Sequence, residues 1–175
     1  MSGRRAVFLD RDGTVIEDAH YPSSADQVRV RPGAAEALRA LRDDGFLLAV
    51  VSNQSGIGRG LITSEQAAEV HERFVAELER RDVRLDAVRY CPHTPDEGCV
   101  CRKPAPGLIL DAADELGADP SKSFMVGDTA SDVAAGKAAG CRTIAIGARG
   151  ETGADWTATS WAEVVAIVRA GREAA

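Results

Sequence analysis

Residues 6–14 read AVFLDRDGT, and this stretch decides both the fold and the position of the site. Its first four residues form a continuous apolar run, which is typical of a strand buried on both faces of a parallel sheet. The run ends at Asp10, and Asp12 supplies a second carboxylate after one intervening residue and directly before a glycine. Ligands bind at the carboxyl ends of the strands in open α/β sheets. We therefore expect both aspartates to lie at a functional site rather than in an ordinary polar turn.

Two carboxylates at this spacing can divide the chemistry of one site between them. One can attack a substrate or bind a metal ion while the other transfers a proton. A calcium-binding EF-hand loop is excluded, because that loop needs a third ligand before its glycine and a distant glutamate. Residues 10–14 are thus a candidate catalytic motif.

Apolar runs and amphipathic segments alternate along the rest of the chain. Strands are predicted at residues 6–9, 46–51, 87–90, 123–126 and 143–146, with a short strand near Trp156. Helices are predicted at residues 33–43, 106–117, 132–139 and 161–170, and another from Thr63, which has capping-box spacing with Gln66, to about residue 80. Repeated strand–helix units predict an α/β fold, a Rossmann-like doubly wound and mainly parallel sheet with helices on both faces.

The length and composition fit one domain over residues 1–175. The chain has 175 residues, of which 45% are hydrophobic and 27% are charged, and this balance is ordinary for a folded domain. The segments from Asp12 to Pro32 and from Ser52 to Lys103 leave no room for an inserted domain. We therefore expect no cap domain over the site.

Charge and hydropathy exclude several kinds of partner. The formal net charge is −6 and no basic block is present, so neither nucleic acid nor a membrane surface is an expected partner. No apolar run approaches the roughly 20 residues of a membrane span. The N-terminal sequence enters the first predicted strand at once, which leaves no room for a signal peptide. We expect a cytoplasmic protein that acts as a monomer.

A second acidic motif, GDTASD at residues 127–132, follows the fourth predicted strand. Asp128 can reach a Mg²⁺ ion beside Asp10, since this cation prefers oxygen ligands and is often held by one or two carboxylates. Asp132 fits two roles. It can be the N-cap of the next helix, or a supporting carboxylate that orients Lys103 or a metal-bound water.

Three further segments carry groups that suit a phosphate. Ser52 and Asn53 follow the second predicted strand, where a hydroxyl and backbone N–H groups can cradle an anion. Residues 55–60, SGIGRG, predict a flexible loop that carries Arg59. Lys103 can place a point charge on a phosphoryl group, and the adjacent Arg102 offers a two-pronged donor. The alternative for Lys103 is an ordinary exposed lysine.

A cysteine-rich loop predicts a metal site. Cys91, His93, Cys99 and Cys101 give four soft or borderline ligands in one loop, which suits a closed, tetrahedral and structural zinc ion. The remaining cysteine, Cys141, is expected to be a buried core thiol.

Two histidines remain outside these motifs. His71 is expected only to pack within its helix. His20, in a loop near the first motif, either touches substrate or lies on the surface.

The order Asp10-x-Asp12-Gly13-Thr14, Ser52, Lys103 and Gly127-Asp128-x-x-x-Asp132 resembles the four motifs of the haloacid dehalogenase-like phosphohydrolases. More narrowly, DRDGT, SNQSGIGRG, YCPH…CVCRKPAPG and the zinc spacing are similar to those of the D-glycero-D-manno-heptose-1,7-bisphosphate 7-phosphatases. The similarity runs from residue 7 to about residue 150. The related histidinol-phosphatases share the zinc loop and many of these motifs.

This resemblance implies a Mg²⁺-dependent phosphomonoester hydrolase. Asp10 would attack phosphorus to form an aspartyl-phosphate, and Asp12 would protonate the leaving alkoxide and later deprotonate the hydrolytic water. Asp10, the backbone carbonyl of Asp12, and Asp128 would hold Mg²⁺, while Ser52 and Lys103 would bind the phosphoryl oxygens. The residues implied to line the substrate site are Asp18, Tyr21, Ser52, Asn53, Gln54, Ser55, Arg102 and Lys103.

The implied substrate is a small phosphorylated sugar, a heptose 1,7-bisphosphate that loses its 7-phosphate. Histidinol phosphate or another small sugar phosphate is the alternative. Arg59 and Arg102 are candidates to hold the second phosphate. Some relatives carry a lysine where this chain has Thr129, so one positive charge is absent there. A zinc-organised binding module, the competing class, would be expected to lack at least one of the motif residues, all of which are present.

Overall fold

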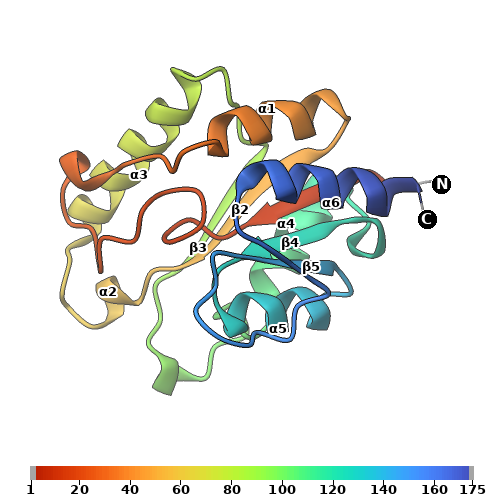
Figure 1. Cartoon of the computed structure of the whole chain (residues 1–175). Coiled ribbons are helices and arrows are strands. Elements are labelled where there is room, and N and C mark those ends of the chain that lie inside the picture. Colours follow the sequence, from red (N-terminus) through yellow and green to blue (C-terminus); the bar gives the residue numbers. More distant parts are fainter. Residues whose placement is uncertain (1–2, 174–175) are drawn as a thin grey trace.

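The sheet of the computed structural model, which describes residues 3–173, contains six strands that pair only in parallel (Figure 1). Their spatial order is β3-β2-β1-β4-β5-β6. The strands are β1 (Ala6–Leu9), β2 (Leu47–Asn53), β3 (Ala87–Cys91), β4 (Phe124–Gly127), β5 (Arg142–Ile146) and β6 (Trp156–Ala158). The helices are α1 (Ala34–Asp43), α2 (Ser55–Gly58), α3 (Ser64–Glu79), α4 (Gly107–Leu116), α5 (Ala130–Ala138) and α6 (Trp161–Glu173).

The strand order reverses between β1 and β4, and this reversal places the site. Strand β1 pairs with β2 along one edge and with β4 along the other, with Leu9 opposite Val126. The amide of Asp10 continues the pairing by donating to the carbonyl of Val126 over 3.0 Å. The residues that follow β1 and β4 therefore emerge side by side at the topological switch point. This arrangement confirms the predicted doubly wound sheet.

Helices cover both faces of the sheet. Helices α1, α3 and α6 lie on one face, where Leu9 of β1 and Phe74 of α3 belong to the same buried apolar cluster. Helices α4 and α5 cover the other face, where Phe8 of β1 packs with Ile109 of α4. Successive residues of β1 thus point into two separate cores. This two-sided burial is the reason that the strand reads as a continuous apolar run.

Two local predictions need correction. Helix α5 begins at Ala130 rather than at residue 132, because Thr129 is its N-cap and Asp132 is the third residue of a capping box. The role of Asp132 as an N-cap is therefore wrong. The segment predicted as a flexible loop at residues 55–60 contains the short helix α2. The capping box of Thr63 and Gln66 at the start of α3 is confirmed.

Short connections replace a cap domain within residues 3–173. Between β1 and α1 the chain forms only a 3₁₀ turn at Ala25–Gln27, and the chain between β2 and β3 is occupied by α2 and α3. The absence of a cap over this part of the chain agrees with the prediction. The loops at the carboxyl ends of the strands must therefore form the walls of any site. None of the helices between residues 3 and 173 has the length and apolar character needed to cross a membrane.

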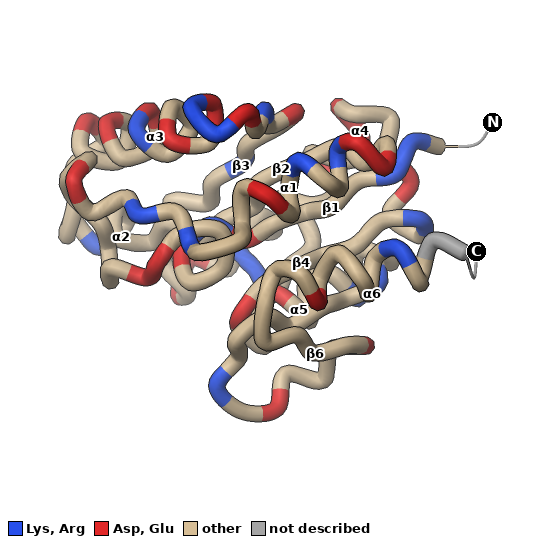
Figure 2. The backbone as a smooth tube through the Cα atoms, turned by 45° about the horizontal axis from the view of Figure 1, so that its top comes forward, with Lys and Arg blue, Asp and Glu red and all other residues tan. Residues whose placement is uncertain are grey.

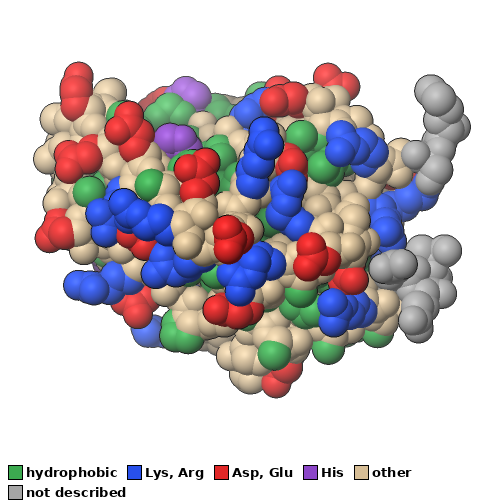
Figure 3. Space-filling model, turned by 90° about the horizontal axis from the view of Figure 1, so that it is seen from above, with side chains coloured by type: hydrophobic (Ala, Val, Ile, Leu, Met, Phe, Trp, Pro, Cys, Tyr) green, Lys and Arg blue, Asp and Glu red, His purple; other side chains and the backbone are tan. Residues whose placement is uncertain are grey.

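Charged side chains lie mainly on the helices and loops, with both signs mixed. Figure 2 shows both acidic and basic residues on α1 and α3, with acidic residues in the majority on α3. The space-filling view of the face over α1, α3 and α6 shows the same mixture (Figure 3). Ion pairs such as Arg39 with Glu36, and Arg81 with Glu77, join opposite charges on these helices. This face offers no extended surface of one sign that would attract a polyanion.

Candidate active site

A buried lysine lies at the centre of the site. The ammonium of Lys103 donates to Asp10 Oδ1 over 2.7 Å, to Asp132 Oδ1 over 2.6 Å and to the carbonyl of Val51 over 2.8 Å. These three bonds use all three of its N–H groups. Burial opposes the charge, but the carboxylates of Asp10 and Asp132 outweigh it and raise the pKa of Lys103. Lys103 is therefore a fixed positive charge and not the exposed lysine of the alternative prediction.

The carboxylates around Lys103 carry more charge than it can neutralise. Asp10, Asp128 and Asp132 bring one carboxylate oxygen each to within 4.8 Å of one another. Burial raises the pKa of Asp10 to about 8, and burial followed by the charge of Asp132 raises the pKa of Asp128. When all three carboxylates are ionised, they exceed the single ammonium of Lys103 by two negative charges. A divalent cation with a preference for oxygen ligands, such as Mg²⁺, fits this cluster in both charge and donor type.

Gly13 lets Asp128 approach the first motif. Its φ is +82°, and a Cβ atom there would lie 2.5 Å from Asp128 Oδ2, closer than a side chain allows. The neighbouring hydroxyl of Thr14 donates to Asp128 Oδ1 over 3.1 Å. The glycine of the first motif thus serves both the turn and the contact between the two acidic motifs.

Asp12 lies in a different environment from Asp10. Its carboxylate accepts from Nε and Nη2 of Arg11 over 3.1–3.3 Å, and Nε2 of Gln54 donates to its Oδ2 over 2.7 Å. Nε2 of Gln54 also lies 2.8 Å from the hydroxyl of Ser52. The side chain of Asp12 remains 19% exposed, so it borders the open part of the site while Asp10 faces the lysine.

Arg11 and Tyr90 are site residues that sequence reasoning missed. The buried guanidinium of Arg11 lies 5.2 Å from the centre of the Tyr90 ring and donates to its hydroxyl over 3.3 Å. The same hydroxyl lies 2.8 Å from Nδ1 of His71, so His71 does more than pack within its helix. The available signal was the position of Arg11 between two aspartates, two residues after the end of a buried strand, where a cation needs partners.

Residues 52–55 form a wall between Asp12 and Lys103. Ser52, Gln54 and Ser55 are buried. Asn53 makes two 3.0 Å hydrogen bonds with the main chain of Lys103, one in each direction. The structure therefore gives Asn53 the task of holding Lys103 in place.

The segment that contains Asp18 and Tyr21 lies beside α2. A Cβ atom on Gly56 of α2 would lie 2.8 Å from the Tyr21 ring, so the two segments touch. Asp18 accepts from the amide of His20 over 3.0 Å, and both His20 and Tyr21 have positive φ. Asp18 and Tyr21 are exposed, as residues that line an open site would be.

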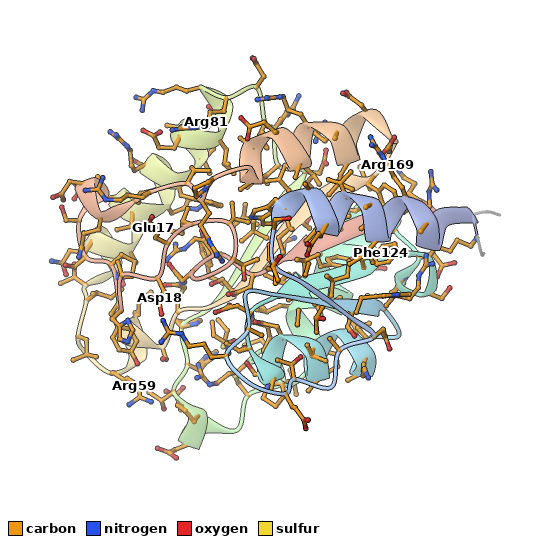
Figure 4. The ribbon with its side chains drawn as sticks, in the orientation of Figure 1. Glu17, Asp18, Arg59, Arg81, Phe124 and Arg169 are labelled. Atoms are coloured by element: carbon orange, nitrogen blue, oxygen red, sulfur yellow. The ribbon has the colours of Figure 1, made fainter. Side chains whose placement is uncertain are left out.

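The two arginines expected to hold a second phosphate lie apart from the carboxylate cluster. Arg102 is half-buried, and its Nη1 donates to the carbonyl of His93 over 3.2 Å. Arg59 is exposed at the end of α2, and Figure 4 shows it at the margin of the molecule. A cavity of about 730 Å³ instead opens beside Asp128, and its lining includes Arg31 and Arg149. Neither of these arginines belongs to a recognisable motif.

The four predicted zinc ligands converge. The Sγ atoms of Cys91, Cys99 and Cys101 lie 3.1–3.5 Å apart, and Nδ1 of His93 lies 3.3–3.4 Å from two of them. Zinc–sulfur bonds of about 2.3 Å require edges of about 3.8 Å in a tetrahedron. A small expansion of this cluster therefore fits the ion, and no disulfide joins these cysteines.

The zinc loop is hydrogen-bonded to the segment that follows β2 and is continuous with the segment that carries Lys103. The carbonyl of Cys91 accepts from the amide of Gln54 over 2.7 Å, and the carbonyl of Pro92 accepts from the amide of Gly58 over 3.1 Å. The last ligand, Cys101, stands two residues before Lys103. The loop therefore supports Gln54, which contacts Asp12, and also the backbone that carries Lys103.

The fold and the site together define a class of protein: an α/β enzyme that holds a cluster of aspartates and one buried lysine at the switch point of its sheet. A family model described as haloacid dehalogenase-like hydrolase matches residues 18–140. The chain belongs to the haloacid dehalogenase-like hydrolases.

Individual relatives resemble the chain over almost its whole length. A D-glycero-beta-D-manno-heptose-1,7-bisphosphate 7-phosphatase of Yersinia pestis is 41% identical, covering 94% of this chain and 95% of the relative. The protein of the same name from Escherichia coli K12 is 39% identical, covering 94% and 93%. The crystal structure of a D,D-heptose 1,7-bisphosphate phosphatase from B. bronchiseptica with magnesium and phosphate is 28% identical, with a TM-score of 0.84 over 95% of this chain and 98% of that chain.

Gly13→Ala should weaken Mg²⁺ binding by at least about tenfold, because the new Cβ displaces Asp128 and the positive φ strains the backbone. Isothermal titration calorimetry measures the affinity. Gly140→Ala is the matched control, since Gly140 has a φ of +87° with no atom within 4 Å of the added Cβ. The control should lose about 1–2 kcal/mol of stability and keep its Mg²⁺ affinity. Equal affinities in the two variants would contradict this role of Gly13.

Cys99→Ser should reduce the zinc content from one ion per chain and lower the melting temperature, because the loop loses one of its four ligands. Elemental analysis and thermal unfolding measure the two effects. Cys141→Ser, at the buried cysteine outside the cluster, is the control and should leave the zinc content unchanged. A Cys99→Ser protein that retains a full equivalent of zinc would refute the site.

Proposed function

We propose that this chain is a Mg²⁺-dependent phosphomonoester hydrolase that removes the 7-phosphate of D-glycero-D-manno-heptose 1,7-bisphosphate. The observation that carries the proposal is the position of Lys103 between Asp10 and Asp132, beside Asp128 at the switch point. Phosphoryl transfer depends mainly on positioning and charge neutralisation, and this centre provides both. The heptose substrate is supported by the names of relatives that are 39–41% identical over nearly the whole chain.

Asp10 is the proposed nucleophile. Its Oδ1 is fixed by Lys103, which leaves Oδ2 to attack phosphorus from the side opposite the leaving oxygen. A bond forms between Oδ2 and phosphorus, and the bond from phosphorus to the sugar oxygen breaks. Lys103 is proposed to offset the negative charge of the phosphoryl oxygens, and the hydroxyl of Ser52 is proposed to donate a hydrogen bond to one of them, because both groups lie beside the carboxyl end of β2.

Asp12 is the proposed acid and base. Its partly exposed carboxylate can give a proton to the departing sugar oxygen and then take one from the water that cleaves the aspartyl-phosphate. Gln54 and Arg11 fix the orientation of this carboxylate. Arg11 and Gln54 are therefore proposed as positioning residues.

The metal and the remaining candidates complete the proposed site. Asp10, the backbone carbonyl of Asp12, and Asp128 would hold Mg²⁺, which when bound supplies positive charge to the phosphoryl oxygens. Asp132 is proposed to act through Lys103 and the cap of α5. The proposed substrate-lining residues are Asp18, Tyr21, Asn53, Gln54, Ser55, Arg59 and Arg102. Cys91, His93, Cys99 and Cys101 are proposed to hold a structural zinc ion.

The remaining proposals concern the working form of the protein. A cytoplasmic location is supported by four cysteines that no disulfide joins, three of them proposed zinc ligands, because a reducing compartment preserves thiols. A monomer formed by one domain is supported by the position of all the proposed site residues on one chain and around one sheet.

Asp10→Asn should lower kcat to below about a hundredth of the wild-type value, since an amide is a poor nucleophile and a poor Mg²⁺ ligand. Asp12→Asn is the comparison within the same motif. It should also slow turnover but should retain Mg²⁺ affinity, because only its backbone carbonyl is proposed to bind the metal. Steady-state kinetics with an aryl phosphate and calorimetry with Mg²⁺ test the pair. Substantial turnover by Asp10→Asn would exclude the aspartyl-phosphate route.

The wild type should rank the heptose 1,7-bisphosphate above other substrates. The test compares kcat/KM for both anomers of the bisphosphate, histidinol phosphate and simple sugar monophosphates. We expect a preference of at least about tenfold for one bisphosphate anomer, because an additional phosphate adds at least one charge-assisted contact. A preference for histidinol phosphate would identify the alternative function.

A further inference from the structure

We propose that Arg149, on the loop between β5 and β6, binds the phosphate of the substrate that does not react. This inference rests on the proposed function, because it needs a substrate with two phosphates. The loop at residues 147–152 thereby takes part in substrate selection, although it contains none of the recognisable motifs.

The cavity beside Asp128 connects this loop to the reacting centre. Its volume is about 730 Å³, and its wall includes Gly13, Asp128, Thr129, Arg149 and Thr152. Gly13 and Asp128 belong to the two acidic motifs, so one end of the cavity reaches the proposed metal ligands. Sites for small ligands occupy about 300–1,000 Å³, and this cavity is large enough for a phosphorylated sugar.

Two residues of the cavity wall, Arg31 and Thr129, already form contacts within the protein. The guanidinium of Arg31 donates to the carbonyl of Gly13, and a Cβ atom on Gly147 would lie 3.4 Å from it. Arg31 therefore fixes the base of the loop against the first motif. The hydroxyl of Thr129 lies 2.8 Å from Asp132 Oδ2 and 2.9 Å from the hydroxyl of Ser131, so it serves the start of α5.

Arg149 differs from both. It is exposed, and among residues 3–173 no hydrogen bond or ion pair involves its side chain. An arginine offers five N–H donors that match phosphate oxygens in pairs. Arg149 is therefore an uncommitted cation on the wall of a cavity that reaches the reacting centre.

The acidic residues of the cavity wall suit the sugar that connects the two phosphates of the substrate. Glu17, Asp18 and Glu151 also line the cavity, and the first two lie on the segment that follows β1 (Figure 4). Carboxylates accept hydrogen bonds from sugar hydroxyls. They also repel free anions, so a phosphate is expected to bind here only when a polyol connects it to the reacting group.

The arginines considered from the sequence are less suited to this role. Arg102 donates to the carbonyl of His93 and lines a separate groove in the zinc loop. Arg59 does not line the cavity beside Asp128. The ordinary explanation for an exposed arginine is solvation, and the effect of removing Arg149 on two matched substrates distinguishes solvation from binding.

The experiment measures KM and kcat for Arg149→Ala with heptose 1,7-bisphosphate and with heptose 7-phosphate, which lacks the second phosphate. Loss of one charge-assisted contact should raise KM for the bisphosphate by about tenfold and leave KM for the monophosphate within about twofold. Arg149→Lys should restore part of the affinity. Inhibition by heptose 1-phosphate, the product that keeps the distal phosphate, should weaken by the same factor as KM.

Arg84→Ala is the control for the change in charge. Arg84 is exposed and precedes β3, at the end of the sheet opposite the site. A wild type without preference for the bisphosphate would overturn the proposed function and this inference together. A wild type that prefers the bisphosphate, with KM unchanged in Arg149→Ala or raised equally for both substrates, would overturn this inference alone and leave the proposed function intact.

Discussion

The buried ammonium of Lys103 is the interaction on which the site depends. An unpartnered charge in a protein interior costs several kcal/mol, so the fold must supply partners wherever this side chain lies. Those partners are Asp10 after β1, the carbonyl of Val51 in β2, and Asp132 in α5. They come from segments far apart in the sequence that meet only because the strand order reverses between β1 and β4. The contacts that stabilise the charge of Lys103 and the topology of the sheet therefore require the same arrangement of these segments.

The two aspartates of the first motif owe their different roles to their surroundings. Asp10 faces Lys103 and two further carboxylates, and burial raises its pKa. Asp12 faces a guanidinium and an amide, and part of its side chain reaches solvent. Placing two chemically identical groups in environments of opposite charge is a general way to separate a nucleophile from a proton carrier. Strand alternation would direct two residues at this spacing to the same side, so the turn that follows β1 produces that separation.

Sequence reasoning reached the fold and the residues at the ends of the strands. Buried parallel strands leave uninterrupted apolar runs, and the polar residues that end them, such as Asp10 and Asp128, are visible as breaks in the pattern. The pairing of Arg11 with Asp12 was missed, because contacts between adjacent residues depend on turn geometry that no periodicity reports. Arg149 was missed for a different reason: its significance comes from a cavity whose walls belong to three loops. The start of α5 was misplaced because Thr129 and Asp132 are both good capping residues, and only the backbone decides between them.

The strand order also determines when the site can form during synthesis. Strand β1 is made first and lies in the middle of the sheet, but its second neighbour, β4, begins only at Phe124. A nascent chain that ends before this residue can pair β1 with β2, yet one edge of its central strand remains unpaired and Lys103 lacks Asp132. Domains fold as units once their sequence is available, and unpaired strand edges invite association with other chains. A chain made only as far as the residues before Phe124 is thus the form most exposed to misassembly, and synthesis of the remaining residues both completes the pairing of β1 and supplies Asp132 to the lysine.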